Sequence, residues 1–239
     1  MKFTIDVPKD TKPVEFTKYI MKALVDHVSE KKIKLFSFPQ PEAVFFDGEK
    51  LTFETEIIEA PPVKLCDYRN IPITMKHKEI PVDDVDKAVD FLRAMKDKEL
   101  GKTLTDVEFS KIMGHYSIET LKSAIQLEMF REKEKINRLD SIEQISDYLL
   151  KNCRVSIPGH LLDQLSTANY HEEVKKWVAG GNMITNIPKD GRKKVRQKTE
   201  EETKLRLIFD AIIDKEKIVS ENPYQTCIDK LLLEAKIIF

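Results

Sequence analysis

The hydrophobic positions between Ser117 and Asn152 recur every three or four residues, in a stretch that contains neither Gly nor Pro. This spacing is typical of an amphipathic helix, whose apolar stripe here consists of Ile118, Leu121, Ile125, Met129, Ile136, Leu139, Ile142, Ile145 and Leu149. A single helix of this length extends for about 50 Å. The charged run Arg131–Lys135 interrupts the stripe, and Asp140-Ser141 could cap a second helix. Two collinear helices are therefore the alternative to the continuous helix that we favour.

The first sixty residues combine strand and helix patterns. Apolar and polar residues alternate over positions 3–7, which predicts a half-buried strand ending at Pro8. A helical face follows over residues 13–32. Further strands are predicted over residues 34–38, 42–46 and 51–58. Asp47-Gly48 supplies a hairpin turn between the last two, so this region forms a small α+β head.

Beyond residue 62 the pattern becomes almost entirely helical. After an extended stretch up to residue 74, helices are predicted over residues 82–98, 105–113, 117–152, 158–179, 192–217 and 221–236. We expect an α+β protein in which a strand-containing N-terminal head precedes an elongated, all-helical body with a long arm helix. The expected domains are a head over residues 1–62, an extended linker over 63–80 and a helical domain over 81–239.

Composition indicates a soluble protein with a core. Of the 239 residues, 41% are hydrophobic and 34% are charged, and the formal net charge is -1. This balance gives no general attraction to nucleic acid or to a membrane. Cys66, Cys153 and Cys227 are far apart and odd in number, which favours reduced thiols in the cytoplasm. The alternating N-terminus does not resemble an export signal, and the sequence has no apolar run of about 18 residues for crossing a bilayer.

No sequence motif for catalysis, phosphate binding or metal binding is present. The chain lacks the Walker A, dinucleotide-binding, H-E-x-x-H and C-x-x-C patterns. Its 7 Gly residues are few for building a phosphate-binding loop. Its His residues are scattered, and its carboxylate pairs suit a solvated surface better than acid–base chemistry. We therefore expect a protein without catalytic residues, metal or cofactor that acts by binding.

Two sets of residues are candidates for that binding. Adaptable apolar side chains could form a surface for varied partners, with packing in the core as the favoured alternative for each: Phe109, Met113, Tyr116, Met129, Phe130, Tyr170, Trp177 and Met183. A basic run could contact the ribosome or RNA, although a solvated helix start explains it as well: Arg192, Lys193, Lys194 and Arg196.

Several blocks of sequence resemble the trigger factor family of ribosome-associated chaperones. They are LTDVEFSKIMG, SIETLKSAIQLEM, CRVSIPGHLLDQL, EEETKLRLIFDAIIDKEKI and CIDKLLLEAKIIF, in the order found in the C-terminal substrate-binding domain of that family. Upstream, KPVEFTKYIMKALVDHVSEKKI and LTFETEIIEAPPVKLCDYRNIPIT resemble the second half of the family's ribosome-binding domain. The helical stretch VDDVDKAVDFLRAMKD resembles its linker helix.

The chain departs from the family pattern in three places. The ribosome-docking G-F-R-x-G-K loop is missing, because the segment between Val7 and Lys18 is PKDTKPVEFT and does not contain this motif. No peptidyl-prolyl isomerase domain fits between Lys98 and Leu104, and the helices near the C-terminus are shortened. The resemblance implies ATP-independent holding of unfolded or nascent polypeptides in an apolar cradle, without prolyl isomerase activity.

Other functions remain open on the same scaffold. A specific interaction or assembly factor, acting as a homodimer or with one folded partner, would bind one saturable ligand without general holding activity. A ribosome- or RNA-binding module would use the basic run, and its affinity would fall steeply with salt.

Overall fold

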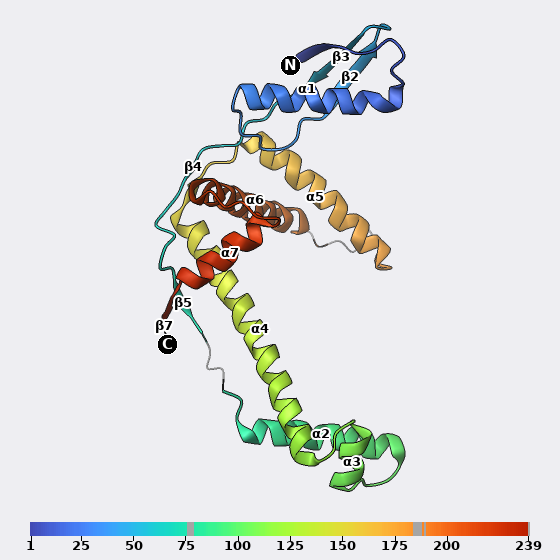
Figure 1. Cartoon of the computed structure of the whole chain (residues 1–239), viewed down its shortest axis with the longest axis vertical. Coiled ribbons are helices and arrows are strands. Elements are labelled where there is room, and N and C mark those ends of the chain that lie inside the picture. Colours follow the sequence, from blue (N-terminus) through green and yellow to red (C-terminus); the bar gives the residue numbers. More distant parts are fainter. Residues whose placement is uncertain (76–78, 184–187, 189, 239) are drawn as a thin grey trace. The chain divides into compact units, whose positions relative to one another are not determined.

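The computed structural model describes residues 1–75, 79–183, 188 and 190–238, and it has the predicted α+β class (Figure 1). Its contacts divide the chain into two compact units. The first unit contains Met1–Leu65 and Cys153–Ala211, and the second contains Cys66–Asn152 and Ile212–Phe239. Each unit is therefore built from segments that are distant in the sequence.

The first unit begins with a three-stranded antiparallel sheet and one helix. The strands are β1 (Lys2–Asp6), β2 (Pro41–Phe46) and β3 (Lys50–Thr55), in the order β1-β3-β2. A 3-10 turn at Pro13–Glu15 leads into α1 (Phe16–Glu30), which packs its buried Ile20 and Leu24 against the sheet residues Leu51 and Phe53. These side chains form the core of the head.

The turn between β2 and β3 forms as the Asp47-Gly48 pair predicts. Gly48 has a φ of 102°, in the left-handed region that glycine adopts without a steric penalty. The Asp47 carboxylate accepts hydrogen bonds from the amides of Glu49 and Lys50 at 2.9 and 2.7 Å. These hydrogen bonds lower the pKa of Asp47 below its ordinary value.

The strand predicted over residues 34–38 is wrong. Leu35 makes only an isolated bridge to Glu59, and Phe36 donates one amide hydrogen bond to the carbonyl of Ile58. Pro39 follows directly and lacks an amide hydrogen, so a longer ladder cannot form. The strand predicted over residues 51–58 is also shorter than expected: β3 ends at Thr55.

The rest of the first unit is helical apart from one short strand pair. β4 (Val63–Lys64) pairs antiparallel with β6 (Arg154–Val155), and α5 (Gly159–Ala179) and most of α6 (Gly191–Glu216) follow. A second core joins Phe36 to Leu161 and Leu207. The Arg206 guanidinium lies 5.1 Å from the centroid of the Phe36 ring and donates to the Phe36 carbonyl at 3.1 Å. This core packs the residues after α1 against α5 and α6.

The second unit is organised around the long helix. It contains α2 (Val82–Leu100), α3 (Asp106–Ile112), α4 (Ile118–Asn152) and α7 (Pro223–Glu234). α4 is continuous, as predicted. Ser141 does not cap a second helix, because its hydroxyl donates to the carbonyl of Asn137 one turn earlier at 2.7 Å.

The predicted all-helical body is wrong at its C-terminal end. The helix predicted to reach residue 236 ends at Glu234, and β7 (Lys236–Ile238) pairs in parallel with β5 (Pro72–Thr74). The adjacent Ile237 and Ile238 favour a strand, but their partner lies far upstream in the sequence. The predicted linker over residues 63–80 thus contains two short strands, and its residues 76–78 lie outside the described part of the chain.

The contact-based units do not follow the order of the predicted domains. The head groups with residues 153–211, which belong to the predicted helical domain. Boundaries at residues 62 and 80 therefore remain a proposal about independent folding. Among the described helices, none is long and apolar enough to cross a membrane.

Candidate functional site

The eight apolar candidates for a binding surface fall into different environments. Phe109, for which core packing was the alternative to a surface role, is fully buried in a core with Val89, Leu104 and Leu121. The Arg93 guanidinium lies 5.2 Å from the centroid of its ring. Phe109 therefore stabilises the packing of α2, α3 and α4 and does not contribute to an open surface.

Four other candidates lie near this core or farther along α4. Met113 is half-buried against the core, whereas the side chain of Tyr116 is 97% exposed just before α4 begins. Met129 is half-buried and Phe130 is 36% exposed, both on α4. The second unit therefore presents Tyr116 and Phe130 directly to solvent.

The remaining three apolar candidates lie in the first unit. Tyr170 is half-buried on α5, with the Arg192 guanidinium 5.7 Å from its ring centroid. Trp177, also half-buried, donates its indole N–H to the carbonyl oxygen of Met183 at 3.1 Å. Met183 itself is 71% exposed. These contacts bring Trp177 and Met183 together at the C-terminal end of α5.

The basic candidates lie exposed at the start of α6 and are partly neutralised. Lys194 pairs with Asp190 at 2.7 Å, and Arg196 pairs with Asp163 at 3.1 Å. The pairing with Lys194 lowers the pKa of Asp190. Two of the four cations therefore already have acidic partners.

Sequence reasoning missed other exposed apolar side chains in the second unit. Phe91 and Met95 are 65% and 56% exposed on α2, and Leu127 is 50% exposed on α4. Phe91 and Met95 lie one turn apart, beside the buried positions Val85 and Val89. Apolar residues adjacent to a helical stripe were the available signal, but the same pattern is typical of a wider buried face.

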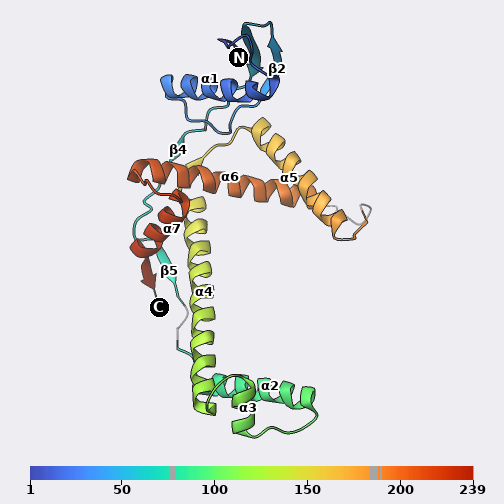
Figure 2. The same ribbon diagram turned by 45° about the vertical axis from the view of Figure 1, so that its right-hand side comes forward.

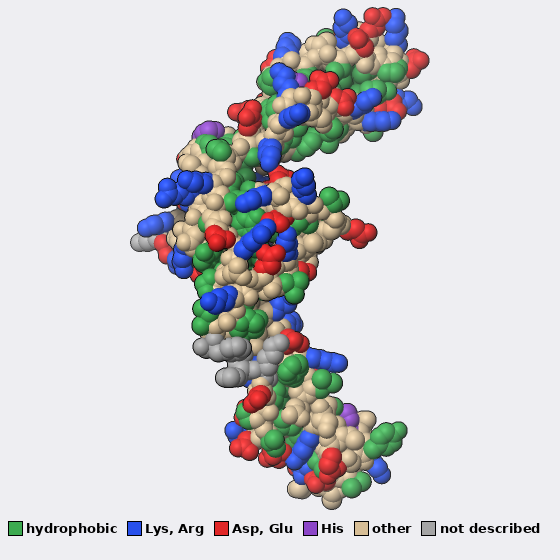
Figure 3. Space-filling model, turned by 60° about the vertical axis from the view of Figure 1, so that its left-hand side comes forward, with side chains coloured by type: hydrophobic (Ala, Val, Ile, Leu, Met, Phe, Trp, Pro, Cys, Tyr) green, Lys and Arg blue, Asp and Glu red, His purple; other side chains and the backbone are tan. Residues whose placement is uncertain are grey.

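Two hollows lie along α4. The first has a volume of about 530 Å³ and is lined by Glu79, Ile80, Ser123, Gln126, Leu127 and Phe130. The second has a volume of about 510 Å³ and is lined by Met75, Arg131, Glu134, Lys135, Asn137, Arg138, Ser141 and Leu232. In the face drawn in Figure 3, hydrophobic side chains alternate with charged ones and do not form one continuous apolar sheet.

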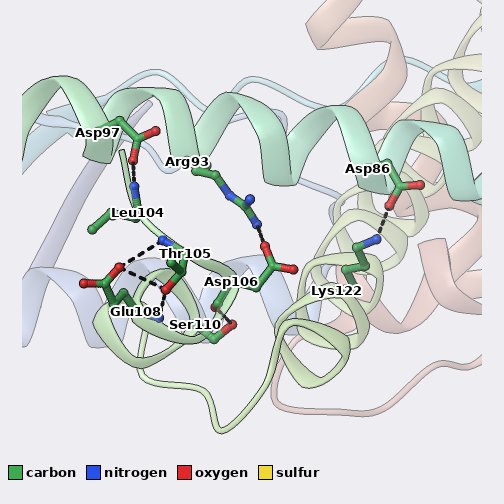
Figure 4. A network of polar contacts seen from close by, with 9 residues as sticks. All are labelled: Asp86, Arg93, Asp97, Leu104, Thr105, Asp106, Glu108, Ser110 and Lys122. Atoms are coloured by element: carbon green, nitrogen blue, oxygen red, sulfur yellow. Dashed lines mark hydrogen bonds and ion pairs between the residues drawn. The ribbon is translucent and has the colours of Figure 1, made fainter. Parts of the chain in front are cut away.

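A polar network fixes the helices that carry these surfaces (Figure 4). Thr105 caps α3, since its hydroxyl accepts from the Glu108 amide at 3.3 Å while Glu108 accepts from the Thr105 amide at 3.0 Å. Lys102 also bonds Glu108 at 2.9 Å, and these contacts lower the pKa of Glu108 to about 2. Arg93 pairs with Asp106, which ties α2 to the first turn of α3.

The same network continues from the loop between α2 and α3 to the start of α4. The Leu104 amide donates to the Asp97 carboxylate at 2.9 Å, so α2 holds the residue that precedes the α3 cap. Lys122 on α4 pairs with Asp86 on α2 at 2.6 Å, which raises the pKa of Lys122. Polar contacts at both ends of α2 therefore supplement the apolar core around Phe109.

A second polar cluster joins the upstream segment to α6 and α7. The Glu216 carboxylate accepts from the Tyr68 hydroxyl at 2.6 Å and from Arg69 at 3.2 Å, and it pairs with Lys230. Lys230, followed by Tyr68 and Arg69, lowers the pKa of Glu216 to about 2. Burial, together with Glu216, raises the pKa of Tyr68 to about 12. These groups form a structural cluster whose donors are directed at one carboxylate.

The arrangement is suited to binding apolar groups. Across residues 1–75, 79–183, 188 and 190–238, no group of three or more His, Cys, Asp or Glu side chains could hold a metal ion. The features that stand out are exposed aromatic and aliphatic side chains on helices held by ion pairs and caps. Such surfaces are typical of contact with other polypeptides.

Comparison with models of known protein families matches about half of the chain. Residues 117–231 match the family model described as bacterial trigger factor protein (TF) C-terminus, a region that includes α4, α5, α6 and most of α7. A search of curated proteins finds no match.

One similar solved structure is described as "Promiscuous Substrate Recognition in Folding and Assembly Activities of the Trigger Factor Chaperone". The identity is 12% and the TM-score is 0.44, and the alignment covers 92% of this chain and 83% of that chain.

Proposed function

We propose that this trigger-factor-like protein is a chaperone that holds unfolded or nascent polypeptides without ATP. The observation that carries the proposal is the match of residues 117–231 to the C-terminal region of trigger factor. That region is the substrate-binding part of the family and is distinct from its isomerase domain. The coarse function of a chaperone-type substrate-binding module follows from this match, and the holding activity is our proposal.

Exposed side chains in both units supply surfaces of the required kind. Tyr116 and Phe130 face solvent in the second unit, and Met183 does so beside Trp177 in the first. Burying one large apolar side chain contributes about 1.5 to 3 kcal/mol, so several weak contacts can hold a client reversibly. Methionine and aromatic side chains adapt to varied partners, which favours broad specificity.

We also propose that the protein has no prolyl isomerase activity. The chain passes from the end of α2 at Leu100 to the start of α3 at Asp106 through a short loop. The resemblance to the trigger factor family implies an isomerase domain at this place, and the short loop leaves no room for one. On this proposal the protein works in the cytoplasm as a binding protein without catalytic residues or cofactor.

Light scattering of a denatured model protein tests the holding activity. The denatured protein is diluted into buffer with and without this chain, at several ratios and without nucleotide. We expect aggregation to be suppressed near a one-to-one ratio, and the double variant Tyr116→Ser/Phe130→Ser to be less effective because it removes two exposed apolar groups. A Val14→Ser variant is the control, because Val14 is also exposed, at 82%, but belongs to none of the candidate surfaces.

Failure to suppress aggregation at any ratio would reject the chaperone proposal. Capture of one folded partner or a homodimer would then support an interaction or assembly factor. A discontinuous prolyl-peptide assay is a separate check, in which measurable isomerase turnover would contradict the proposed lack of that activity.

The start of α6 favours a second function, contact with the ribosome or another RNA. Arg192, Lys193 and Lys194 lie in the first turn of the helix, which contains no acidic residue. Cations at this end oppose the helix dipole, typically at a cost of about 0.3 to 1 kcal/mol each, so a phosphate ligand would offset an unfavourable arrangement. The docking loop of the trigger factor family is missing, so this contact would rest on the basic run.

RNA or ribosome binding is tested by replacing Arg192, Lys193, Lys194 and Arg196 with Ala. We expect co-sedimentation with ribosomes to fall and its salt dependence to weaken, because phosphate contacts release bound counterions. Suppression of aggregation should be unchanged in the same variant. Unchanged co-sedimentation would exclude this run as the contact.

A further inference from the structure

The two hollows on α4 belong to a single strip. Six of the α4 residues that line them are spaced alternately by four and three positions: Ser123, Leu127, Phe130, Glu134, Asn137 and Ser141. Residues at this spacing share one face of a helix. The first and second hollows therefore follow one another along the same face, which we call the α4 strip.

The two hollows differ in chemistry. Three residues that line the first hollow are apolar: Leu127 and Phe130 are 50% and 36% exposed, and Ile80 is half-buried opposite them. Among the described residues that line the second, three are cations and one, Glu134, is a carboxylate. One of these cations, Arg138, already pairs with Asp229.

Within the described part of the chain, the other two cations of the second hollow have long, exposed pairings. Arg131 lies 3.7 Å from Glu128 and Lys135 lies 3.8 Å from Glu132, and their side chains are 65% and 68% exposed. Exposed pairs of this kind contribute about 0 to 1 kcal/mol. Arg131 and Lys135 can therefore exchange these partners for an incoming carboxylate at little cost.

The α4 strip already binds an extended main chain at one end. The Thr74 amide donates to the Gln144 side-chain oxygen at 2.7 Å, and the Gln144 side-chain amide donates to the Thr74 carbonyl at 2.9 Å. Gln144 lies three positions after Ser141 on the same face. Both views show β5, the strand that contains Thr74, running beside α4 (Figures 1 and 2).

A second main-chain contact lies near the first hollow. Lys133 donates to the carbonyl oxygen of Glu79 at 2.8 Å. Contacts of this type, like those of Gln144, do not depend on the side chain of the residue that is bound. Polar side chains of α4 thus hold this chain's own extended residues Thr74 and Glu79 by their main chain, beside the two hollows.

We propose that the α4 strip binds an extended client segment, with a large apolar side chain in the first hollow and an acidic side chain beside Arg131 and Lys135 in the second. This inference rests on the proposed chaperone function and names the class of segment that the protein binds. The α4 residues of the two hollows are centred about nine or ten positions apart, which is about 14 Å along the helix. An extended chain covers that distance in about four residues.

Fluorescence anisotropy with labelled short peptides and the full-length chain tests this inference. All peptides share a Gly/Ser background. One carries Phe with Asp about four positions away, the second carries Phe with Lys at that position, and the third carries Ala with Asp. Each is made in two versions, with the charged residue before or after the Phe or Ala. We expect the better Phe/Asp peptide to bind about fivefold more tightly than its Phe/Lys and Ala/Asp counterparts, the difference expected for one exposed charge pair or one partly buried side chain.

Two variants separate the contributions of the hollows. Phe130→Ala should weaken binding of the Phe/Asp peptide, and Arg131→Gln/Lys135→Gln should abolish the preference for Asp over Lys. The control Lys18→Gln/Lys22→Gln removes the same charge at the same spacing from exposed positions of α1 and should keep the preference. Circular dichroism verifies that each variant is folded.

The outcomes distinguish this inference from the chaperone proposal. Equal affinity for all peptides, in a protein that suppresses aggregation, would overturn the α4 strip and leave the chaperone function standing. A preference that persists in Arg131→Gln/Lys135→Gln would also overturn the assignment. Peptide discrimination without suppression of aggregation would support the strip and reject the holding activity.

Discussion

At the scale of single residues, Phe109 and Tyr116 show how burial separates similar side chains. Both are aromatic, and they lie only seven positions apart in the sequence. Phe109 is fully buried among side chains of α2 and α4, whereas Tyr116 is 97% exposed. Residue type alone therefore cannot assign an aromatic side chain to the core or to a binding surface.

This difference predicts opposite consequences for two alanine variants. Phe109→Ala should lower the free energy of unfolding by about 3 to 5 kcal/mol, because it leaves a cavity in the core. Tyr116→Ala should change the stability by less than about 0.5 kcal/mol. Urea denaturation followed by circular dichroism measures both, and a small effect of Phe109→Ala would contradict its place in the core.

Glu216 predicts a dependence of stability on pH. Its pKa is lowered from 4.5 to about 2 by Lys230, Tyr68 and Arg69. The carboxylate therefore stabilises the fold at pH values above about 5, and this contribution is lost as the pH falls toward 2. Glu216→Gln should be less stable than the unchanged protein at pH 7, and this difference in stability, which we call the gap, should be smaller at pH 3.

Thermal unfolding at both pH values measures that gap. Tyr68→Phe is the matched control, because it removes one hydrogen bond to Glu216 and keeps the carboxylate. Since Lys230 and Arg69 still pair with Glu216 in this control, most of the acid sensitivity should remain. A gap for Glu216→Gln that is equal at pH 7 and pH 3 would exclude the proposed contribution of this carboxylate.

At the scale of elements, local sequence signals explain where the helices begin. Thr105 and Glu108 form a reciprocal capping box at the start of α3, and Asn222 accepts from the Gln225 amide at 3.2 Å at the start of α7. α4 continues past Asp140 because Ser141 bonds within the helix. Caps stabilise short helices most, since these have few internal hydrogen bonds of their own.

The α3 cap predicts a measurable loss of stability. Thr105→Ala removes the hydroxyl that accepts from the Glu108 amide and should cost about 1 kcal/mol. Thr103→Ala is the control, because Thr103 is exposed on the same loop and lies outside the cap. Chemical denaturation compares the two variants, and equal stabilities would show that the cap contributes little.

At the scale of the whole molecule, the chain passes repeatedly between its two units. Residues 1–65 pack with residues 153–211, while α4 belongs to the second unit together with the C-terminal segment. The head nevertheless has its own core of Val7, Ile20, Leu24, Leu51 and Phe53. Its residues Phe36, Ile58 and Ala60 pack against side chains of α5 and α6.

The isolated fragment 1–62 tests the boundary proposed from the sequence. We expect it to keep its sheet and α1, because the head core lies entirely within it. It should bind a hydrophobic dye more strongly than the full chain, since Phe36 and Ile58 lose the cover of Leu161 and Leu207. An unfolded fragment by circular dichroism would show that the head depends on the later helices.

The sequence by itself determined the elements whose signals are local. Periodicity located α1, α2 and the continuous α4, and Asp47-Gly48 located the turn between β2 and β3. The resemblance of its blocks to trigger factor agrees with the match of residues 117–231. Each of these signals depends on neighbours within one or two turns, or on the order of blocks along the chain.

Tertiary structure alone decided the features that depend on distant partners. β7 forms because Lys236–Ile238 meets Pro72–Thr74, and Phe109 is buried because α2 and α4 pack against α3. The α4 strip likewise needs Met75, Ile80 and Leu232 beside residues of α4. Contacts between residues so far apart in the sequence leave no periodic signal, because the pattern of apolar and polar residues within a segment does not depend on which distant segment it contacts.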